Sequence, residues 1–180
     1  MTIDAGTGDG RAVLAAAARE PGALVLGFDA NAASMAEASR RAARPARKGG
    51  LPNAGFVVAA AEAPPAELAG VAGLATVQFP WGSLLRGVVG RDGAVAAGLA
   101  TLVAPDGALE LLVAPIERDG LDGIPSSSAD LIAGAARAFG PHGFVVEGAE
   151  QPTLAEIRAT GSTWARRLER RATLIRLVRR

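Results

Sequence analysis

Residues 4–10 read Asp-Ala-Gly-Thr-Gly-Asp-Gly, with glycine at every second position from 6 to 10. A short apolar run comes before this stretch, and an alanine-rich run at 11–19 follows it. Glycine lets the backbone turn sharply and approach a ligand closely. The stretch therefore predicts a strand, a ligand-holding loop and a helix in direct succession.

The rest of the chain alternates short β-rich runs with longer helical ones. Strands are expected over 1–4, 24–29, 56–60, 74–79, 109–113, 144–147 and 174–178, and helices over 11–19, 33–44, 94–102 and 129–139. Such alternation predicts an α/β fold with a mostly parallel sheet. We expect one domain, 1–180, with ligands at the carboxyl ends of the strands. The loops concerned follow Asp4, Asp29, Ala60 and Phe79.

Composition excludes several classes of protein. The 180 residues are 49% hydrophobic and 21% charged, which excludes a disordered tail. Because there is no cysteine, disulfides, zinc–thiolate sites and a catalytic thiol are excluded, and a cytoplasmic location is expected. The longest uncharged run, 68–85, is broken by glycine, glutamine and proline, so we expect no membrane partner. No metal site is expected either.

The glycine spacing distinguishes between two kinds of cofactor loop. A dinucleotide fingerprint would place its third glycine at position 11, which is Arg11. The D-x-G-x-G-x-G spacing instead resembles motif I of the class I S-adenosylmethionine-dependent methyltransferases. Asp29 ends the next strand, where a carboxylate can accept both ribose hydroxyls of an adenosine. Glu62 follows the third strand and is the next cofactor candidate. The open alternatives are a capped glycine turn for the loop and a solvated carboxylate for Glu62.

The chain has two tryptophans and no tyrosine. Trp81 follows Phe79-Pro80, in the position of the Asn/Asp-Pro-Pro-Tyr motif of amino-methyltransferases, where a ring stacks on the target base. The carbonyl of Phe79 would there accept a hydrogen bond from the base. Trp164 is expected in a loop or at a loop edge before the last strand. Two indoles can offset base extrusion, because stacking contributes about 1–3 kcal/mol per base and unstacking costs a few. A buried structural indole at each position is the alternative.

Five segments together resemble the aminoglycoside-resistance 16S rRNA methyltransferases that modify adenine-1408 at N1, the kanamycin–apramycin type. They are residues 4–11, 46–53, 59–62, 79–82 and 162–168, and the likeness extends over the whole chain. The resemblance implies a Rossmann-like sheet of strand order 3-2-1-4-5-7-6 with an antiparallel last strand. Members have a segment before motif I, whereas this chain begins three residues before Asp4, so a truncated first strand is expected.

The resemblance also implies roles for individual residues. S-adenosylmethionine, which leaves as S-adenosylhomocysteine, would be bound by Asp4, Gly6, Gly8, Gly10, Asp29, Ala61 and Glu62. The target adenine would lie between Trp81 and Trp164, and Ser162 and Arg167 match the family's substrate-contacting positions. No general base is expected, because adenine N1 already has a free lone pair and the single histidine, His142, lies in a Gly-Pro-His-Gly turn.

Charge is distributed unevenly along the chain. The net charge is +1, yet residues 40–48 hold five bases and no acid, and residues 166–180 hold seven bases and one acid. We expect RNA contacts from Arg44, Arg47, Lys48, Arg166, Arg167, Arg170 and Arg171, with the decoding site of the 30S subunit as partner and the protein acting as a monomer. A solvated basic face, a small-molecule methyltransferase and an inactive homologue remain as alternatives.

Overall fold

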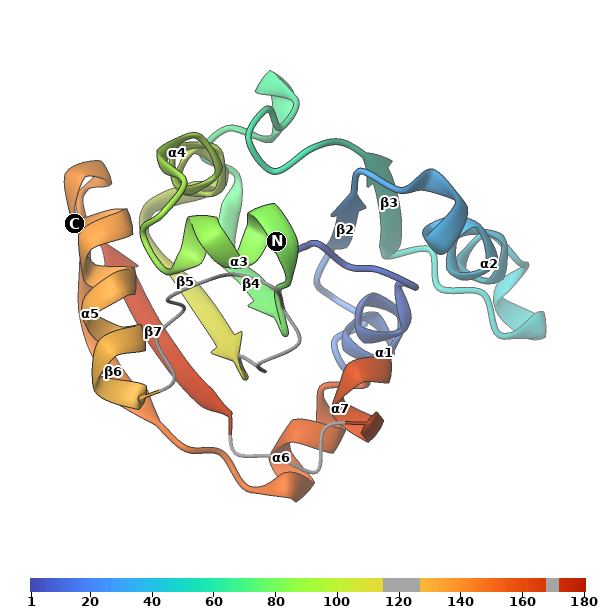
Figure 1. Ribbon diagram of the computed structural model, residues 1–180. Helices are drawn as coiled ribbons and strands as arrows, with labels where there is room; N and C mark the ends of the chain where they lie inside the picture. The colour runs from blue at the N-terminus through green and yellow to red at the C-terminus, as the bar shows by residue number, and fades with distance from the viewer. Residues whose placement is uncertain (115–126, 168–171) are drawn as a thin grey trace.

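The computed structural model describes residues 1–114, 127–167 and 172–180 (Figure 1). In this part of the chain seven strands form one sheet of order β3-β2-β1-β4-β5-β7-β6, as the resemblance implies. The pairs formed among β1 to β5 are all parallel, and β7 is antiparallel to both β5 and β6. The strands are β1 (Thr2–Ala5), β2 (Val25–Asp29), β3 (Ala54–Val58), β4 (Ala72–Gln78), β5 (Val103–Val113), β6 (Phe144–Glu150) and β7 (Thr173–Arg179).

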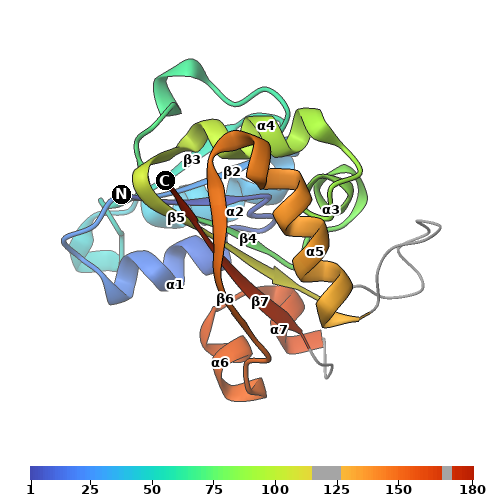
Figure 2. The same cartoon turned by 90° about the vertical axis from the view of Figure 1, so that its left-hand side faces the viewer.

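Helices cover both faces of the sheet. α3, α4 and α5 lie on one face, and α1, α6 and α7 lie on the other (Figures 1 and 2). α2 packs on β3 and against α1. The helices are α1 (Arg11–Arg19), α2 (Ala32–Ala42), α3 (Gly82–Val88), α4 (Gly93–Leu102), α5 (Ser128–Phe139), α6 (Leu154–Ala159) and α7 (Thr163–Arg167). Among the described residues, no helix is long and apolar enough to cross a membrane.

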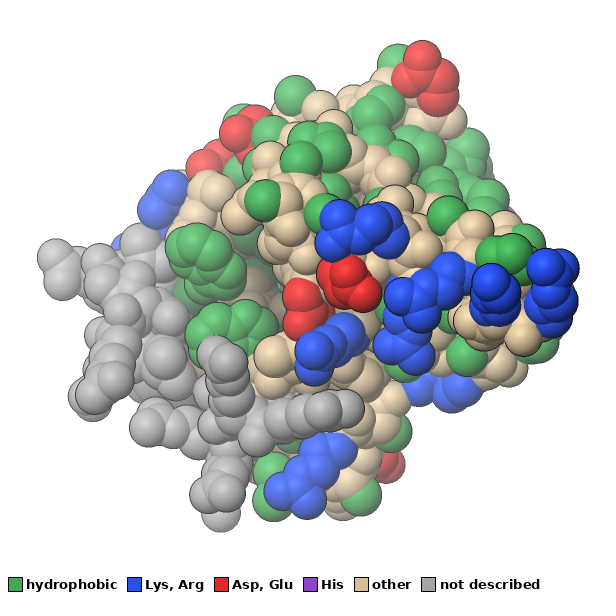
Figure 3. All heavy atoms as spheres, turned by 90° about the vertical axis from the view of Figure 1, so that its right-hand side faces the viewer, with side chains coloured by type: hydrophobic (Ala, Val, Ile, Leu, Met, Phe, Trp, Pro, Cys, Tyr) green, Lys and Arg blue, Asp and Glu red, His purple; other side chains and the backbone are tan. Residues whose placement is uncertain are grey.

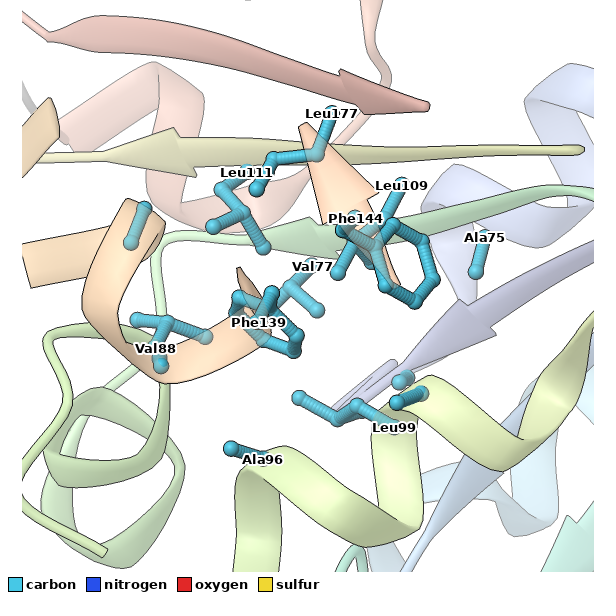
Figure 4. Packing of buried hydrophobic residues seen from close by; sticks show 14 of the residues in the cluster. Ala75, Val77, Val88, Ala96, Leu99, Leu109, Leu111, Phe139, Phe144 and Leu177 are labelled. Atoms are coloured by element: carbon cyan, nitrogen blue, oxygen red, sulfur yellow. The ribbon is translucent and has the colours of Figure 1, made fainter. Parts of the chain in front are cut away.

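The main core lies between the sheet and the α3–α5 layer (Figure 4). Leu99 of α4 and Leu109, Leu111 and Leu177 of the sheet have no exposed surface. The rings of Phe139 and Phe144 meet edge to face at 5.9 Å between centroids, which joins the end of α5 to β6. Because helices cover both faces of the sheet, the central strands are largely apolar and do not alternate between apolar and polar residues.

The loops that surround the site begin at one edge of the sheet. β1 pairs with β2 on one side and β4 on the other, so that Asp4 lies opposite both Gly27 and Thr76. After β3 the chain crosses over to β4, and the strand order therefore reverses between β1 and β4. Ligands of such sheets bind at this reversal, outside the carboxyl ends of the strands.

Several boundaries differ from the sequence predictions. The expected strand at 56–60 lies two residues earlier, and β5 starts at Val103, six residues before the expected strand. α3, α6 and α7 were not predicted, because each has seven residues or fewer and shows no helical periodicity. Trp164 is the second residue of α7 and so lies at the edge of the loop before it, in line with the expected loop or loop edge. β1 has four residues, in line with the expected short strand.

Candidate active site

A cavity of about 780 Å³ opens at the carboxyl ends of β1 to β4. Its wall is made by the four loops that sequence reasoning singled out, together with residues 162–164 from the far end of the chain. The reversal of strand order between β1 and β4 thus coincides with an open cavity. Its dimensions are in the range of small-molecule and cofactor sites, which measure about 300–1,000 Å³.

The glycine loop forms one wall of this cavity. Gly6, Gly8 and Gly10 have φ angles of +71°, +57° and +71°, a conformation that glycine adopts at little cost. A Cβ at Gly6 would lie 2.4 Å from Leu84, whereas at Gly8 it would meet nothing within 4 Å. Gly8 therefore faces open space on the cavity side. Gly10 does not line the cavity; a Cβ there would lie 2.5 Å from Phe56, so this glycine allows α1 to start close to β3.

Asp29 is held between two loops. Its Oδ2 accepts a hydrogen bond from the amide of Gly8 at 2.9 Å, and its Oδ1 accepts one from the amide of Asn31 at 2.8 Å. Asn31 in turn caps α2 by accepting from the amide of Ala33. The carboxylate is thus fixed at the cavity wall, with lone pairs on both oxygens left for a ligand.

Asp4 lies beneath the loop and is 5% exposed. Its Oδ1 accepts hydrogen bonds from Thr76 Oγ1 at 2.7 Å and from Gln78 Nε2 at 3.3 Å. Burial raises the pKa of the Asp4 carboxyl above its ordinary 3.8; hydrogen bonds lower it in part, and the charge of Asp29 raises it further. A cationic group placed in the cavity beside Asp4 would favour the ionised form.

Two buried polar atoms near Asp4 lack a hydrogen-bond partner among the described residues. They are Thr7 Oγ1 and Gln78 Oε1, and both residues line the cavity. Thr7 lies close enough to Asp4 to lower the pKa of its carboxyl, but the contact lacks the geometry of a hydrogen bond. Buried polar groups are nearly always paired in folded proteins, so unpaired ones beside a cavity indicate a polar ligand.

The loop after β3 closes the cavity from the side of α4. The carbonyl oxygen of Ala61 would lie 2.0 Å from a Cβ at Gly98, so this glycine lets α4 pack directly on the loop. Ala61 is half-buried, and Glu62 is exposed at the rim of the cavity. A carboxylate in this position can reach a ligand that extends out of the cavity.

The chain turns sharply at Phe79-Pro80-Trp81. Phe79 has a φ angle of +49°, which is uncommon for a residue other than glycine. Its amide donates to the carbonyl of Leu112 in β5 at 2.8 Å, and its ring is 7% exposed, so the surrounding structure holds the turn. Strained backbone of this kind is found preferentially at functional sites. Trp81 follows directly and is 70% exposed.

Trp164 lines the same cavity as Trp81, comes from the five-residue helix α7, and is 45% exposed. The alternative of a buried structural indole is therefore wrong at both positions. Ser162 also lines the cavity, with its amide bonded to Thr160 Oγ1 at 3.2 Å. The site thus combines a polar cavity beneath the glycine loop with two exposed aromatic rings at its edge.

The family model described as NpmA, 16S rRNA (adenine(1408)-N(1))-methyltransferase, matches residues 1–179. The chain belongs to this family. It is 35% identical over 176 residues to the 16S rRNA (adenine(1408)-N(1))-methyltransferase of Streptoalloteichus hindustanus, an alignment that covers 93% of this chain and 80% of that protein.

Solved structures of adenine-1408 methyltransferases are also similar. A Trp-to-Ala mutant of the Catenulisporales acidiphilia enzyme, crystallised with cosubstrate SAM, has a TM-score of 0.87 and 32% identity, and covers 99% of this chain and 84% of that chain. The 16S rRNA methyltransferase KamB has a TM-score of 0.85 and 30% identity, with coverages of 98% and 86%.

The basic residues expected to contact RNA fall into two groups. Arg44, Arg47 and Lys48 are exposed just beyond α2, on a face where Lys and Arg gather (Figure 3). Arg166 and Arg167 belong to α7, although their side chains are not described, and Arg170 and Arg171 lie outside the described residues.

Two arginines of the second basic run have structural partners. Arg176 pairs with Glu110 and Glu147 on neighbouring strands, and Arg179 donates to the carbonyl of Val103 at 2.6 Å. Neither of these two arginines is among the expected RNA contacts of this run, which are Arg166, Arg167, Arg170 and Arg171. The pairing of Arg176 and Arg179 depends on strand register, which the sequence does not show.

Sequence reasoning gave no role to several residues that line the cavity, among them Thr7, Gln78 and Thr163. Thr7 lies between the motif I glycines and Gln78 directly precedes Phe79, so proximity to those motifs is a usable signal for both. Thr163 directly precedes Trp164, so its proximity to a predicted site residue is a usable signal as well.

Proposed function

We propose that this chain methylates N1 of adenine-1408 in 16S rRNA of the assembled 30S subunit, uses S-adenosylmethionine as methyl donor, and thereby confers aminoglycoside resistance. The observation that carries the proposal is the exposure of Trp81 and Trp164 on the wall of the cavity that the glycine loop borders. We further propose that residues 1–180 act as one methyltransferase domain and as a monomer in the cytoplasm, where 30S subunits are found.

The cavity suits S-adenosylmethionine in its donors and acceptors. Asp29 accepts from the ribose hydroxyls, and Asp4 lies where the ammonium of the methionine moiety can neutralise it. Ala61 and Glu62 border the adenine, and Gly6, Gly8 and Gly10 give the loop its close approach. The unpaired Thr7 Oγ1 and Gln78 Oε1 support a polar ligand at this depth. When bound, S-adenosylmethionine supplies an electrophilic methyl group and leaves as S-adenosylhomocysteine.

Trp81 and Trp164 hold the extruded adenine by stacking on its two faces. The carbonyl of Phe79 accepts from the exocyclic amine, and Ser162 contacts the base from the other wall. The lone pair of N1 forms the new C–N bond as the C–S bond breaks, and no proton has to be removed first. The residues therefore act by alignment and proximity, which can lower a barrier by about 7–11 kcal/mol. No group of three or more His, Asp or Glu that could hold a metal occurs among the described residues.

Basic side chains contact phosphates of the folded rRNA. They are Arg44, Arg47, Lys48, Arg166, Arg167, Arg170 and Arg171. With about six such contacts, the affinity for 30S subunits falls about 10³-fold between 50 and 200 mM salt. Arg44→Gln should reduce the slope of this dependence by about one, because one counterion fewer is released. Arg137→Gln is the matched control, since Arg137 is exposed at the end of α5 on the opposite layer. Equal slopes for both variants would contradict the docking surface.

Primer extension on 16S rRNA tests the activity directly. Purified 30S subunits are incubated with the protein and S-adenosylmethionine, and a reverse-transcription stop at adenine-1408 is expected, because N1-methylation blocks Watson–Crick pairing. Parallel reactions use free adenosine as acceptor. Methylation of adenosine without modification of 30S subunits would favour a small-molecule methyltransferase instead. Absence of S-adenosylmethionine binding in calorimetry would favour an inactive homologue.

A further inference from the structure

We propose that the hydrogen bond between Asp9 and Thr163 couples the cofactor loop to Trp164. Asp9 and Thr163 are then positioning residues, because they act on the target base through Trp164 and do not touch the reacting atoms. The inference rests on the proposed function in two respects, namely the binding of the cofactor at the glycine loop and the assignment of Trp164 to base stacking.

The contact joins residues 154 positions apart in the sequence. Thr163 Oγ1 donates to Asp9 Oδ2 at 2.5 Å, and both side chains are half-buried at the edge of the cavity. Asp9 Oδ1 accepts from the amide of Arg11 at 3.2 Å, and Arg11 Nε lies 3.5 Å from Oδ2. The carboxylate is thus fixed from the α1 side. Hydrogen bonds to an ionised acceptor are stronger than those between neutral groups.

Asp9 is part of the loop that borders the cofactor. It lies between Gly8 and Gly10, which both have positive φ angles. Thr163 is the first residue of α7, and Trp164 is the next. A shift of Asp9 on ligand binding therefore reaches the indole through one hydrogen bond and one peptide unit.

Two further contacts attach the same segment to α1, away from the cofactor loop. A Cβ at Gly161 would lie 2.6 Å from the Cβ of Ala15, so the backbone there packs closely on the helix. Arg19 Nη1 donates to the carbonyl of Ala159 at 2.5 Å. Residues 159–163 thus run along α1 from its end to its start. Of these three contacts, the Asp9–Thr163 hydrogen bond is the one that a residue of the glycine loop makes.

This arrangement predicts reciprocal coupling between cofactor and base. If binding at the loop sets the position of Asp9, it also sets the orientation of Trp164, and the affinity for rRNA rises. Linkage requires that rRNA raises the affinity for the cofactor by the same factor. Arg19 provides a matched control, because its contact attaches the same segment without involving the loop.

Fluorescence of Trp164 measures the coupling without RNA. In a Trp81→Phe background Trp164 is the single tryptophan, since the chain has two. Titration with S-adenosylhomocysteine should change its emission. We expect Thr163→Val to lose most of this change, with less than about a twofold effect on cofactor affinity, and Thr163→Ser to restore it. Arg19→Gln should retain the change. The same emission change in the Thr163→Val protein would overturn the proposal.

Binding of 30S subunits gives the second measurement. S-adenosylhomocysteine should raise the affinity of the otherwise unmodified protein for 30S subunits several-fold, and this factor should fall to about one in Thr163→Val and in Asp9→Ala. In the double variant this factor should be the same as in either single variant, as expected of residues that act through one contact. Single-variant decreases in the factor that add up in the double variant would overturn the proposal.

Different results would contradict the proposed methylation of adenine-1408 and the proposed coupling through Asp9 and Thr163. If the protein leaves adenine-1408 unmodified while the emission change depends on Thr163, the proposed function fails and the coupling stands. If adenine-1408 is methylated equally well by the unmodified protein and by Thr163→Val, and cofactor raises 30S affinity in both, the coupling fails and the proposed function stands.

Discussion

The two tryptophans of the cavity are held in different ways. Trp81 follows β4, a strand paired on both sides, and the Phe79 amide before it is bonded to β5. Trp164 belongs to a five-residue helix, attached to α1 by the contacts of Asp9, Gly161 and Arg19. One side of the site is therefore part of the sheet. The other is a short helix outside the sheet, held by these contacts and by Ala165, which is buried in one cluster with Phe79 and Leu112. The sheet side should tolerate remote substitutions better than the α7 side.

Removal of either indole should have the largest effect. Trp81→Ala and Trp164→Ala should each lower methyl transfer to 30S subunits about 10- to 100-fold, because stacking contributes about 1–3 kcal/mol per base. Cofactor affinity, measured by calorimetry, should change little for both. Unchanged turnover in both variants would refute the stacking assignment.

Phenylalanine substitutions sharpen the comparison between the two sides. Trp81→Phe keeps an aromatic ring on a backbone that the sheet holds, so most of the activity should remain. Trp164→Phe places a smaller ring on the helix attached by side chains, and a larger loss is expected. Equal losses would show that both rings are equally well positioned.

Removal of the Asp29 carboxylate tests the sheet side. Asp29→Ala should weaken S-adenosylmethionine binding about 10- to 100-fold, since hydrogen bonds to a charged acceptor contribute about 1.5–3 kcal/mol. Asp92→Ala is the matched control, because Asp92 also accepts from two backbone amides, those of Ala94 and Val95, but lies outside the cavity. Calorimetry should show an unchanged affinity for that variant. Equal affinities for both variants would count against the ribose assignment.

The sheet side could be predicted from the order of the strands, whereas Trp164 and Ser162 of the α7 side were expected at the site only through the family resemblance. Motif I, Asp29 and Trp81 each follow a strand, and parallel strands bring their carboxyl ends to one edge, so adjacency followed from topology alone. α1 has the predicted bounds, 11–19. The contacts of Thr163 and Arg19 instead depend on how a segment 140 to 154 residues away packs on α1.

One local signal for the α7 side was present in the sequence. Thr153 and Glu156 form a capping box at the start of α6, a pattern that can be read directly from Thr-x-x-Glu. Recognising it would have placed a helix before Trp164. The short length of α6 and α7 still leaves no periodicity from which to predict the face they bury.

The pH dependence of cofactor binding tests whether the ammonium of S-adenosylmethionine binds beside the buried carboxyl of Asp4. Burial raises the pKa of the Asp4 carboxyl in the folded, cofactor-free protein above 3.8, so protonation of Asp4 favours the folded over the unfolded state. This contribution to the free energy of unfolding is complete below pH 3.8 and is lost as the pH rises through the raised pKa. A bound ammonium favours the ionised form, so the affinity for S-adenosylmethionine should weaken about tenfold per pH unit below the raised pKa.

Asp4→Asn should remove this slope in calorimetric titrations over a range of pH. The same substitution should raise the stability of the cofactor-free protein at neutral pH, because an unfavourable buried charge is absent. Asp92→Asn should keep the slope of the unmodified protein. If Asp4→Asn leaves the slope unchanged, the ammonium does not bind beside Asp4.

The smallest effect is expected from the cap of α6. Thr153 Oγ1 accepts from the amide of Glu156 at 3.3 Å, and Thr153→Ala should cost about 1 kcal/mol of stability, as is usual for an N-cap residue. Ser127 caps α5 in the same way, by accepting from the amide of Asp130 at 3.1 Å, so Ser127→Ala should cost a similar amount in thermal unfolding. Only Thr153→Ala should also lower methyl transfer, by a few-fold, because α6 supports the segment that carries Trp164, whereas α5 covers the opposite face of the sheet. If Thr153→Ala and Ser127→Ala lower methyl transfer equally for the same loss of stability, the α7 side of the site is no more sensitive to remote substitutions than the rest of the protein.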